Sequence, residues 1–139
     1  TFVGYNAGQQ NRTGKNNVYL GCNAGGSHQT GHNNTLLGYG AGGGGGTGRN
    51  NTSVGYLAGA LSFAGSLNVF IGNLAGYNES GSNKLYVANG TDSSRCLIYG
   101  DFATGLLAMT ALVAVRRPSV FWPLVVDSLH APSPATPER

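Results

Sequence analysis

Short apolar runs recur along the first half of the chain, and each run ends at a glycine. They occupy residues 1–3, 18–20, 35–37, 52–54 and 69–71, and most of their residues are β-branched, aliphatic or aromatic. Runs of this composition, bounded by Gly and Asn, predict short strands. Polar and Gly-rich segments separate the runs, and the step from one run to the next is always 17 residues.

Glycine, alanine and asparagine follow the same period. The unit reads N-N-[TV]-x-[VLI]-G-x-x-A-G, and it occurs five times within residues 1–84. A repeat of 17 residues is too short for a helix-turn-helix repeat and too long for a hexapeptide turn, but it suits one coil of a solenoid. We therefore expect an all-β fold, a parallel β-solenoid of five 17-residue coils. Glycine and asparagine would form its corners, and stacked asparagines would form hydrogen-bonded ladders.

Side-chain alternation assigns the two faces of these strands. The first and third positions face one way and the second faces the other. The third position is always aliphatic, so we expect it to line the core: Val3, Leu20, Leu37, Val54 and Ile71. The second position would then form an outer apolar stripe, which usually marks an interface: Phe2, Tyr19, Leu36 and Phe70. We expect this stripe at the axis of a parallel homotrimer. The alternative is that position two closes the core of a wider, single-chain coil.

The repeats also show a family resemblance. The segments NNVYLGCNAG, NNTSVGYLAG and NVFIGNLAG resemble the head repeats of trimeric autotransporter adhesins and longer-unit relatives in bacterial surface proteins and phage tail fibres. The resemblance covers residues 1–84. It implies a left-handed parallel β-roll, a homotrimer, and an adhesive role at the cell surface, outside the cell or on a phage virion. The 17-residue unit is longer than is usual in the adhesin heads.

Beyond the repeats the sequence changes character. Residues 85–105 contain two strand-like runs around an Asn-Gly-Thr-Asp turn, which predicts a β-hairpin cap. Residues 106–139 hold all five prolines, and we expect an irregular or partly helical tail there. Its apolar stretch LLAMTALVAV is too short to span a bilayer, so no membrane insertion by this segment is expected.

Composition narrows the possible functions. Charged residues make up 9% of the 139, the net charge is +3, and no Asp or Glu occurs in residues 1–78. A calcium β-roll needs carboxylates, and the weak basicity does not indicate nucleic-acid binding. The two cysteines lack a zinc-binding spacing, no Ser-His-Asp arrangement is visible, and we expect His28 to be a solvent-facing loop residue. We therefore expect no enzyme activity, no cofactor and no metal site.

Two columns of side chains remain as candidate ligand-binding residues. Lys15, His32 and Arg49 share one place in successive coils, and Tyr5, Tyr39 and Tyr56 share another. Cations and aromatic rings together suit an anionic glycan or a host cell-surface or matrix protein. The leading hypothesis is a surface adhesin module. The alternatives are a phage tail-fibre segment and, from a different class, an ice- or surface-binding solenoid.

Overall fold

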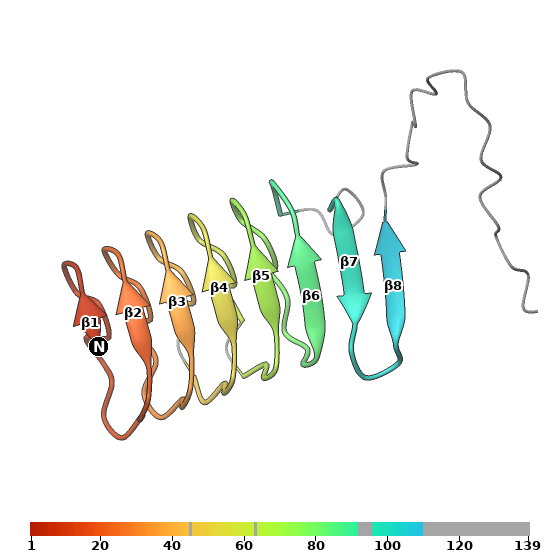
Figure 1. Ribbon diagram of the computed structural model, residues 1–139. Helices are drawn as coiled ribbons and strands as arrows, with labels where there is room; N and C mark the ends of the chain where they lie inside the picture. Colours follow the sequence, from red (N-terminus) through yellow and green to blue (C-terminus); the bar gives the residue numbers. More distant parts are fainter. Residues whose placement is uncertain (45, 63, 92–95, 110–139) are drawn as a thin grey trace, which may run out of the picture.

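The computed structural model describes residues 1–44, 46–62, 64–91 and 96–109, and these residues form strands and turns but no helix. Within these residues, eight strands form a single sheet in chain order (Figure 1). They are β1 (Phe2–Val3), β2 (Val18–Leu20), β3 (Thr35–Leu37), β4 (Thr52–Val54), β5 (Val69–Ile71), β6 (Lys84–Val87), β7 (Ile98–Asp101) and β8 (Leu106–Met109).

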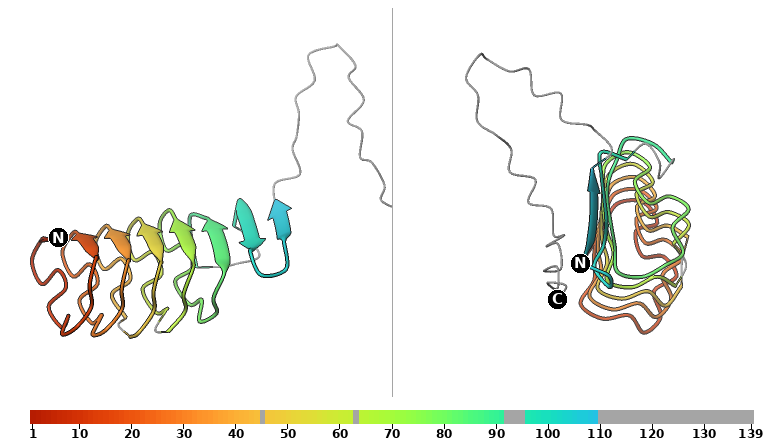
Figure 2. Two further views of the ribbon diagram at one scale, coloured as in Figure 1. Left: turned by 60° about the horizontal axis from the view of Figure 1, so that its bottom comes forward. Right: turned by 90° about the vertical axis from the view of Figure 1, so that its right-hand side faces the viewer.

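The first six strands are parallel and stack in the register of the repeat. Tyr19 lies opposite Phe2, Leu36 opposite Tyr19, and Ser53 opposite Leu36, so the pairing follows the 17-residue step. Seen nearly end-on, the coils overlie one another (Figure 2). The opposite wall is also bonded from coil to coil: the Gly8 N–H donates to the Ala24 carbonyl, and the Gly25 N–H donates to the Ala41 carbonyl, both at 2.9 Å. The predicted parallel β-solenoid is therefore confirmed.

The predicted faces of the strands are wrong. The third-position residues expected in the core lie outside: Val54 is half-buried, and the others are 39–54% exposed, namely Val3, Leu20, Leu37 and Ile71. Tyr19, Leu36 and Phe70, expected at a trimer axis, are at most 1% exposed and form the core. Phe2 is covered by the parallel ring of Tyr19, at a centroid distance of 4.7 Å, and remains 44% exposed. The structure matches the alternative, in which position two closes a single-chain coil.

The flatness of the coil explains this inversion. The strands β2 to β5 have three residues each, and side chains alternate along a strand. The first and third residues face solvent, and the middle residue faces the interior of the coil. The opposite wall lies close to that side chain: a Cβ added to Gly25 would lie 2.7 Å from the Tyr19 ring. The coil has room for one large side chain between its walls. Ser53 fills that place less fully, and the core divides there into two clusters.

Buried asparagines tie successive coils together at the corner before each strand. The side-chain oxygen of Asn17 accepts from the backbone N–H of Asn34 at 2.8 Å, and Asn34 accepts in the same way from Asn51 at 3.0 Å. Each side-chain amide also donates to a glycine carbonyl, as Asn34 does to Gly48 at 2.9 Å. Asn68 continues the series. The predicted asparagine ladder is confirmed, with most of its bonds running from side chain to backbone.

The glycine that ends each strand is required by backbone shape and by stacking distance. Gly21 has φ +133°, a conformation that residues with a Cβ rarely adopt. A Cβ there would lie 2.5 Å from the carbonyl oxygen of Gly38 in the next coil. Successive corners therefore approach closely only because both lack side chains.

Three strands end the sheet among the described residues. β6 is parallel to β5 and antiparallel to β7, which confirms the expected hairpin. β8 adds a further antiparallel strand that was counted as tail in the sequence interpretation. Lys84 Nζ lies 2.7 Å from Asp101 Oδ2, and this bond lowers the pKa of Asp101 and raises that of Lys84. The expected irregular or partly helical segment from residue 110 onward lies outside the described residues.

Candidate functional site

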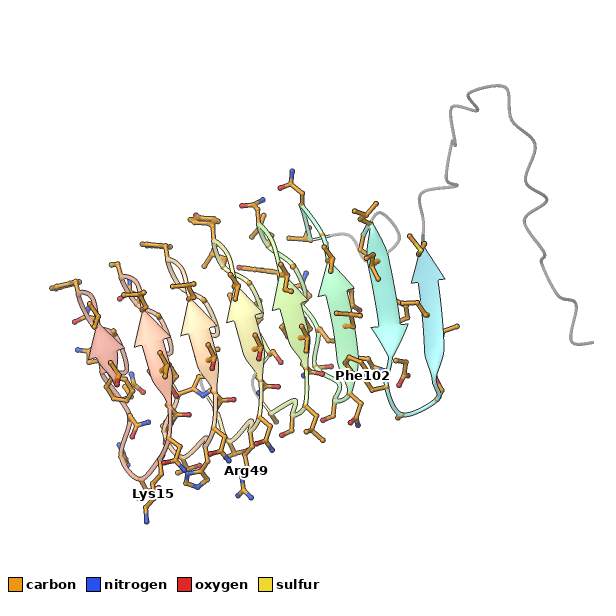
Figure 3. All side chains as sticks on the ribbon, in the orientation of Figure 1. Lys15, Arg49 and Phe102 are labelled. Atoms are coloured by element: carbon orange, nitrogen blue, oxygen red, sulfur yellow. The ribbon has the colours of Figure 1, made fainter. Side chains whose placement is uncertain are left out.

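The basic column occupies the corner of the solenoid that precedes the strands. Lys15 and Arg49 are both exposed there (Figure 3). His32 lies between them in register and is half-buried, because its Nδ1 accepts a hydrogen bond from the Lys15 backbone N–H at 2.9 Å. Ser66 makes the equivalent bond in a later coil, where its hydroxyl accepts from the Arg49 N–H at 3.1 Å. The column therefore exists as predicted, but His32 links two coils and only Lys15 and Arg49 present charges.

The tyrosine column lies at the opposite end of the strands. Tyr39 and Tyr56 stack with ring centroids 5.5 Å apart and planes inclined by 14°. Both are about half exposed, and Tyr5 is more so. Cys22 occupies the intervening place in register, so the ring of Tyr5 has no aromatic neighbour in the next coil. Two stacked rings and one isolated ring make up this surface.

The structure does not bring the two columns into one site. Arg49 precedes Tyr56 by seven residues that include the whole of β4. The strand alone spans about 10 Å. The two columns therefore lie at opposite ends of β4, and a ligand that contacts both would have to lie along the strand.

His28 is buried, contrary to the expectation of a solvent-facing loop residue. Its exposure is 3%, and its ring lies 5.8 Å from that of Tyr19. Burial lowers the pKa of His28 below its ordinary value of 6.5, while a hydrogen bond with the Gly42 backbone acts in the opposite direction. Burial also raises the pKa of Tyr19 to about 12. Neither group is placed or charged to act on a substrate in solvent.

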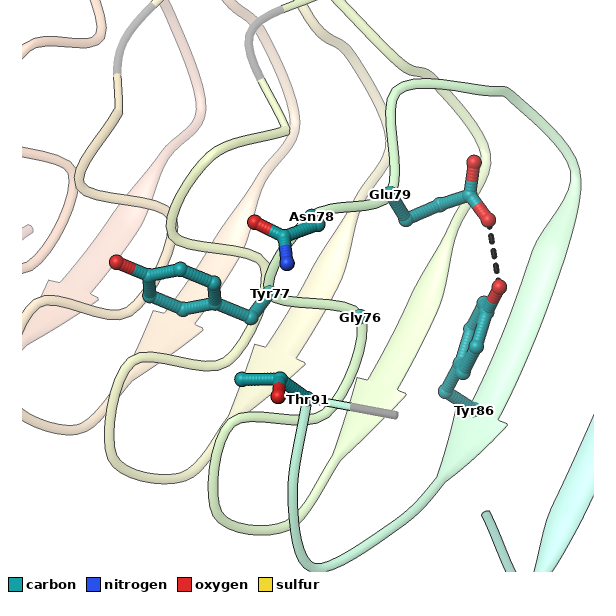
Figure 4. A pocket seen from close by; sticks show the side chains of 6 residues that line it. All are labelled: Gly76, Tyr77, Asn78, Glu79, Tyr86 and Thr91. Atoms are coloured by element: carbon teal, nitrogen blue, oxygen red, sulfur yellow. Dashed lines mark hydrogen bonds between the residues drawn. The ribbon is translucent and has the colours of Figure 1, made fainter. Parts of the chain in front are cut away.

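Glu79 closes the last coil beside a small pocket of about 170 Å³ (Figure 4). One carboxylate oxygen accepts from the Tyr86 hydroxyl at 2.6 Å, and the other accepts from the Gly81 N–H at 2.7 Å. Burial, together with this carboxylate, raises the pKa of Tyr86. Both oxygens of Glu79 are engaged, so the residue fastens β6 to the preceding turn.

A second cavity, which the sequence interpretation did not include, lies on the loops that follow the Ala-Gly step. We call it the loop groove. It holds about 390 Å³ and extends over all five coils, lined by Gln9, Gln10, Asn23, Gly26, Ser27, Tyr39, Gly40, Gly43, Gly44, Leu57, Ala60, Leu61 and Tyr77. Only Tyr39 among them was a candidate residue. The sequence does mark this cavity, because two successive coils have glycine at one loop position. Gly26 and Gly43 stand where the first coil has Gln9 and the last has Tyr77.

These features define a class of protein, an all-β repeat protein built as a parallel solenoid. Comparison of the chain with protein-family models, curated proteins and solved structures finds no match. Among the residues that the structure describes, no helix is long and apolar enough to cross a membrane. Within the same residues no group of three or more His, Cys, Asp or Glu side chains could hold a metal ion.

Proposed function

We propose that the chain is a non-enzymatic structural and adhesive module, displayed on a cell surface or outside the cell, that holds receptor-contacting side chains along a stiff shaft. The observation that carries this proposal is the strict register of the coils. Because each coil overlies the previous one, the backbone of an exposed residue recurs at a strand spacing of about 4.8 Å, which brings equivalent side chains into contact, as in the stacked rings of Tyr39 and Tyr56.

Two continuous bonding systems support the shaft role. The sheet joins six parallel strands on one wall, and the Ala-Gly backbone ladder joins the first five coils on the opposite wall. The buried asparagines add a third line of bonds between the two. A coil held on several sides has little freedom to tilt against its neighbours, which is the property that a spacer between a surface and a receptor needs.

The proposal includes association of copies of the chain. The surface that associates is not formed by the second strand position, which is buried. In register with the third position of the repeat, an outer aliphatic row crosses all eight strands: Val3, Leu20, Leu37, Val54, Ile71, Val87, Ile98 and Met109. Five of these are 39–55% exposed. We propose that copies of the chain, in a homotrimer, cover this row with one another.

A stable contact between copies requires that most of this aliphatic row be covered. Covering the exposed halves of these five side chains contributes about 4–8 kcal/mol per chain, or about 11–23 kcal/mol for the three chains of a trimer. The two association steps together cost about 8–30 kcal/mol in lost freedom. The two ranges overlap, so one charge in the middle of the row suffices to prevent assembly.

Sedimentation velocity of the full chain and of Leu37→Lys tests the assembly. We expect the wild type to sediment as a trimer and Leu37→Lys as a folded monomer. Gln29→Lys, which places the same charge at another exposed position, should remain a trimer. A monomeric wild type would remove association from the proposal.

Adhesion is tested by binding of the full chain to immobilised acidic polysaccharide and to cells. The informative variant is Lys15→Ser with Arg49→Ser, because Ser66 and Ser82 already occupy this column in later coils. Loss of most polysaccharide binding in the double variant would support a role for the basic column. Unchanged binding would exclude the column and leave the tyrosines as the contact.

A phage tail-fibre segment is the second candidate function, since the same shaft would serve there with a bacterial surface as its partner. Binding to bacterial but not to host surfaces would favour it. An ice-binding solenoid has less support, because the flat outer face carries Thr35 and Thr52 between Val18 and Val69 and so lacks a regular threonine file. Measurement of thermal hysteresis tests that alternative directly.

A further inference from the structure

The loop groove is a cavity built by the absence of side chains. Coils two and three carry Gly26, Gly43 and Gly44 where the neighbouring coils carry larger residues. The flanking side chains then stand above a floor of backbone. The resulting groove runs along the axis of the solenoid rather than across it, because its floor residues occupy equivalent places in successive coils.

The two ends of the loop groove differ in chemistry. Gln9 and Gln10 close one end, and Asn23 adjoins them. Among the described residues, none forms a hydrogen bond with these three side-chain amides, so they are open to a ligand. Each such amide offers both donors and an acceptor.

Tyrosine and leucine side chains line the remainder of the loop groove. The ring of Tyr39 is held by its stack on Tyr56, and Tyr77 stands at the far end beside Leu61. An aromatic side chain presents a large apolar surface together with a polar hydroxyl tip. These walls would cover the apolar face of a flat ring while its polar edge stays in contact with water.

The lining contains no charged side chain, which argues against an anionic ligand. The backbone along the floor is already bonded: the Gly40 N–H donates to the Cys22 carbonyl and the Gly43 N–H to the Gly40 carbonyl, both at 2.9 Å, so an extended peptide would find no free strand edge. The volume of about 390 Å³ lies near the lower end of the range of about 300–1,000 Å³ for ligand pockets. A small or narrow neutral ligand, rich in hydroxyls and carrying flat apolar faces, fits these limits.

We propose that the loop groove binds a neutral oligosaccharide, with sugar rings against Tyr39 and Tyr77 and hydroxyl groups bonded to the amides of Gln9, Gln10 and Asn23. This inference rests on the adhesive role proposed above and names a ligand class for it. The site is independent of Lys15 and Arg49, so the two kinds of binding can be lost separately.

The matched variant fills the groove with a residue that the repeat already uses. Gly26→Gln places there the side chain that Gln9 has in the first coil. Gly26 lies outside the left-handed region, so its φ suits a side chain, and the Asn23 carbonyl oxygen, 3.3 Å from the added Cβ, has to shift by a few tenths of an ångström. Thr47→Gln adds the same side chain at an exposed corner away from the groove and serves as the control.

The experiment titrates the full chain with cellohexaose, maltohexaose and chitohexaose and follows its backbone and side-chain amide resonances by NMR. We expect one or more of these sugars to shift the side-chain amides of Gln9, Gln10 and Asn23. Gly26→Gln should weaken that binding at least tenfold, and Thr47→Gln should leave it unchanged. Tyr77→Leu, which keeps an apolar side chain without the ring, should also weaken it.

Two results would overturn the inference. One is the absence of groove shifts with all three neutral sugars, and the other is equal affinity in Gly26→Gln and the wild type. If acidic polysaccharide still binds through Lys15 and Arg49 in either case, the adhesive role stands and only the groove assignment fails. Groove shifts caused by a peptide and by none of the sugars would likewise refute the saccharide assignment.

Discussion

Removal of one buried asparagine tests the idea that side-chain bonds hold the coils in register. Asn34 is fully buried, and its amide donates to the Gly48 carbonyl while its oxygen accepts from the Asn51 N–H. Asn34→Ala removes both the amide that donates to Gly48 and the oxygen that accepts from Asn51. The change leaves a carbonyl and an N–H buried in the corner with no bonding group in reach.

The expected cost follows from these two groups. A buried polar group that loses its partner costs about 1–3 kcal/mol, so two of them predict a loss of about 2–6 kcal/mol in the free energy of unfolding. With a urea dependence of about 1–3 kcal/mol per molar, the unfolding midpoint should fall by roughly 1 M or more. Such a loss is large against the total stability of about 5–15 kcal/mol that is usual for a domain.

Urea unfolding followed by far-ultraviolet circular dichroism measures the shift. The control is Thr35→Val, at the next position of the chain, because Thr35 is exposed and Val18 and Val69 fill the same place in other coils. The control should change the stability by no more than about 0.5 kcal/mol. Equal midpoints for Asn34→Ala and Thr35→Val would mean that the asparagine ladder does not stabilise the stack.

Three further predictions concern packing, backbone strain and pH. Ala41→Val should lower the free energy of unfolding by about 1–3 kcal/mol, because Ala41 is fully buried between walls that leave no room for added methyl groups; thermal unfolding measures this, and a neutral result would show a looser wall. Leu67→Asn should raise the urea midpoint, because Leu67 has φ +62° where Asn16 and Asn33 stand in other coils; that conformation costs most side chains about 1–2 kcal/mol, and Asn lowers the cost through local hydrogen bonds of its short amide. A lower midpoint would show that the exposed leucine contributes packing. Because the pKa of His28 is depressed in the folded state, the unfolded state binds more protons below pH 6.5 and stability falls as the pH decreases, by up to about 1.4 kcal/mol per pH unit for this group. His28→Asn should reduce that slope between pH 6.5 and 5, and identical slopes would show that His28 becomes protonated without loss of fold.

The period, the strands and the corners could be predicted because they depend on neighbouring residues. Gly21, for example, has φ +133°, and this requirement for glycine recurs in the sequence of successive coils, as does the asparagine at the corner before the strand. The faces could not be assigned correctly from the same letters. A uniformly aliphatic column indicated burial, yet Leu37 lies outside and Ser53 inside. The opposite wall packs against the second strand position, as Gly25 does against Tyr19, and the letters of the strand do not show on which side that wall lies.

The missed elements have physical reasons of their own. β8 carries Leu106 and Leu107 side by side, so it shows no alternation, and both are exposed. The clearer signal was the turn before it, where Asp101 accepts from the Ala103 N–H and Gly105 has φ +73°. The loop groove was missed because a cavity is made by residues that are small, and Gly26 and Gly43 have no side chain that marks a site in the sequence. Candidate columns were found where side chains are present, as at Tyr39 and Tyr56.

The bonds between coils run along the axis of the solenoid, and this direction determines how the molecule would respond to a pull on its two ends. Tension along the axis passes in full through each interface between layers. The layers would therefore separate one after another rather than share the load. Each released layer of 17 residues would extend to nearly 60 Å at about 3.4 Å per residue, in place of a stacked thickness of about 4.8 Å. A tether of this design would yield in equal steps of about 50 Å and dissipate work while both ends stay attached.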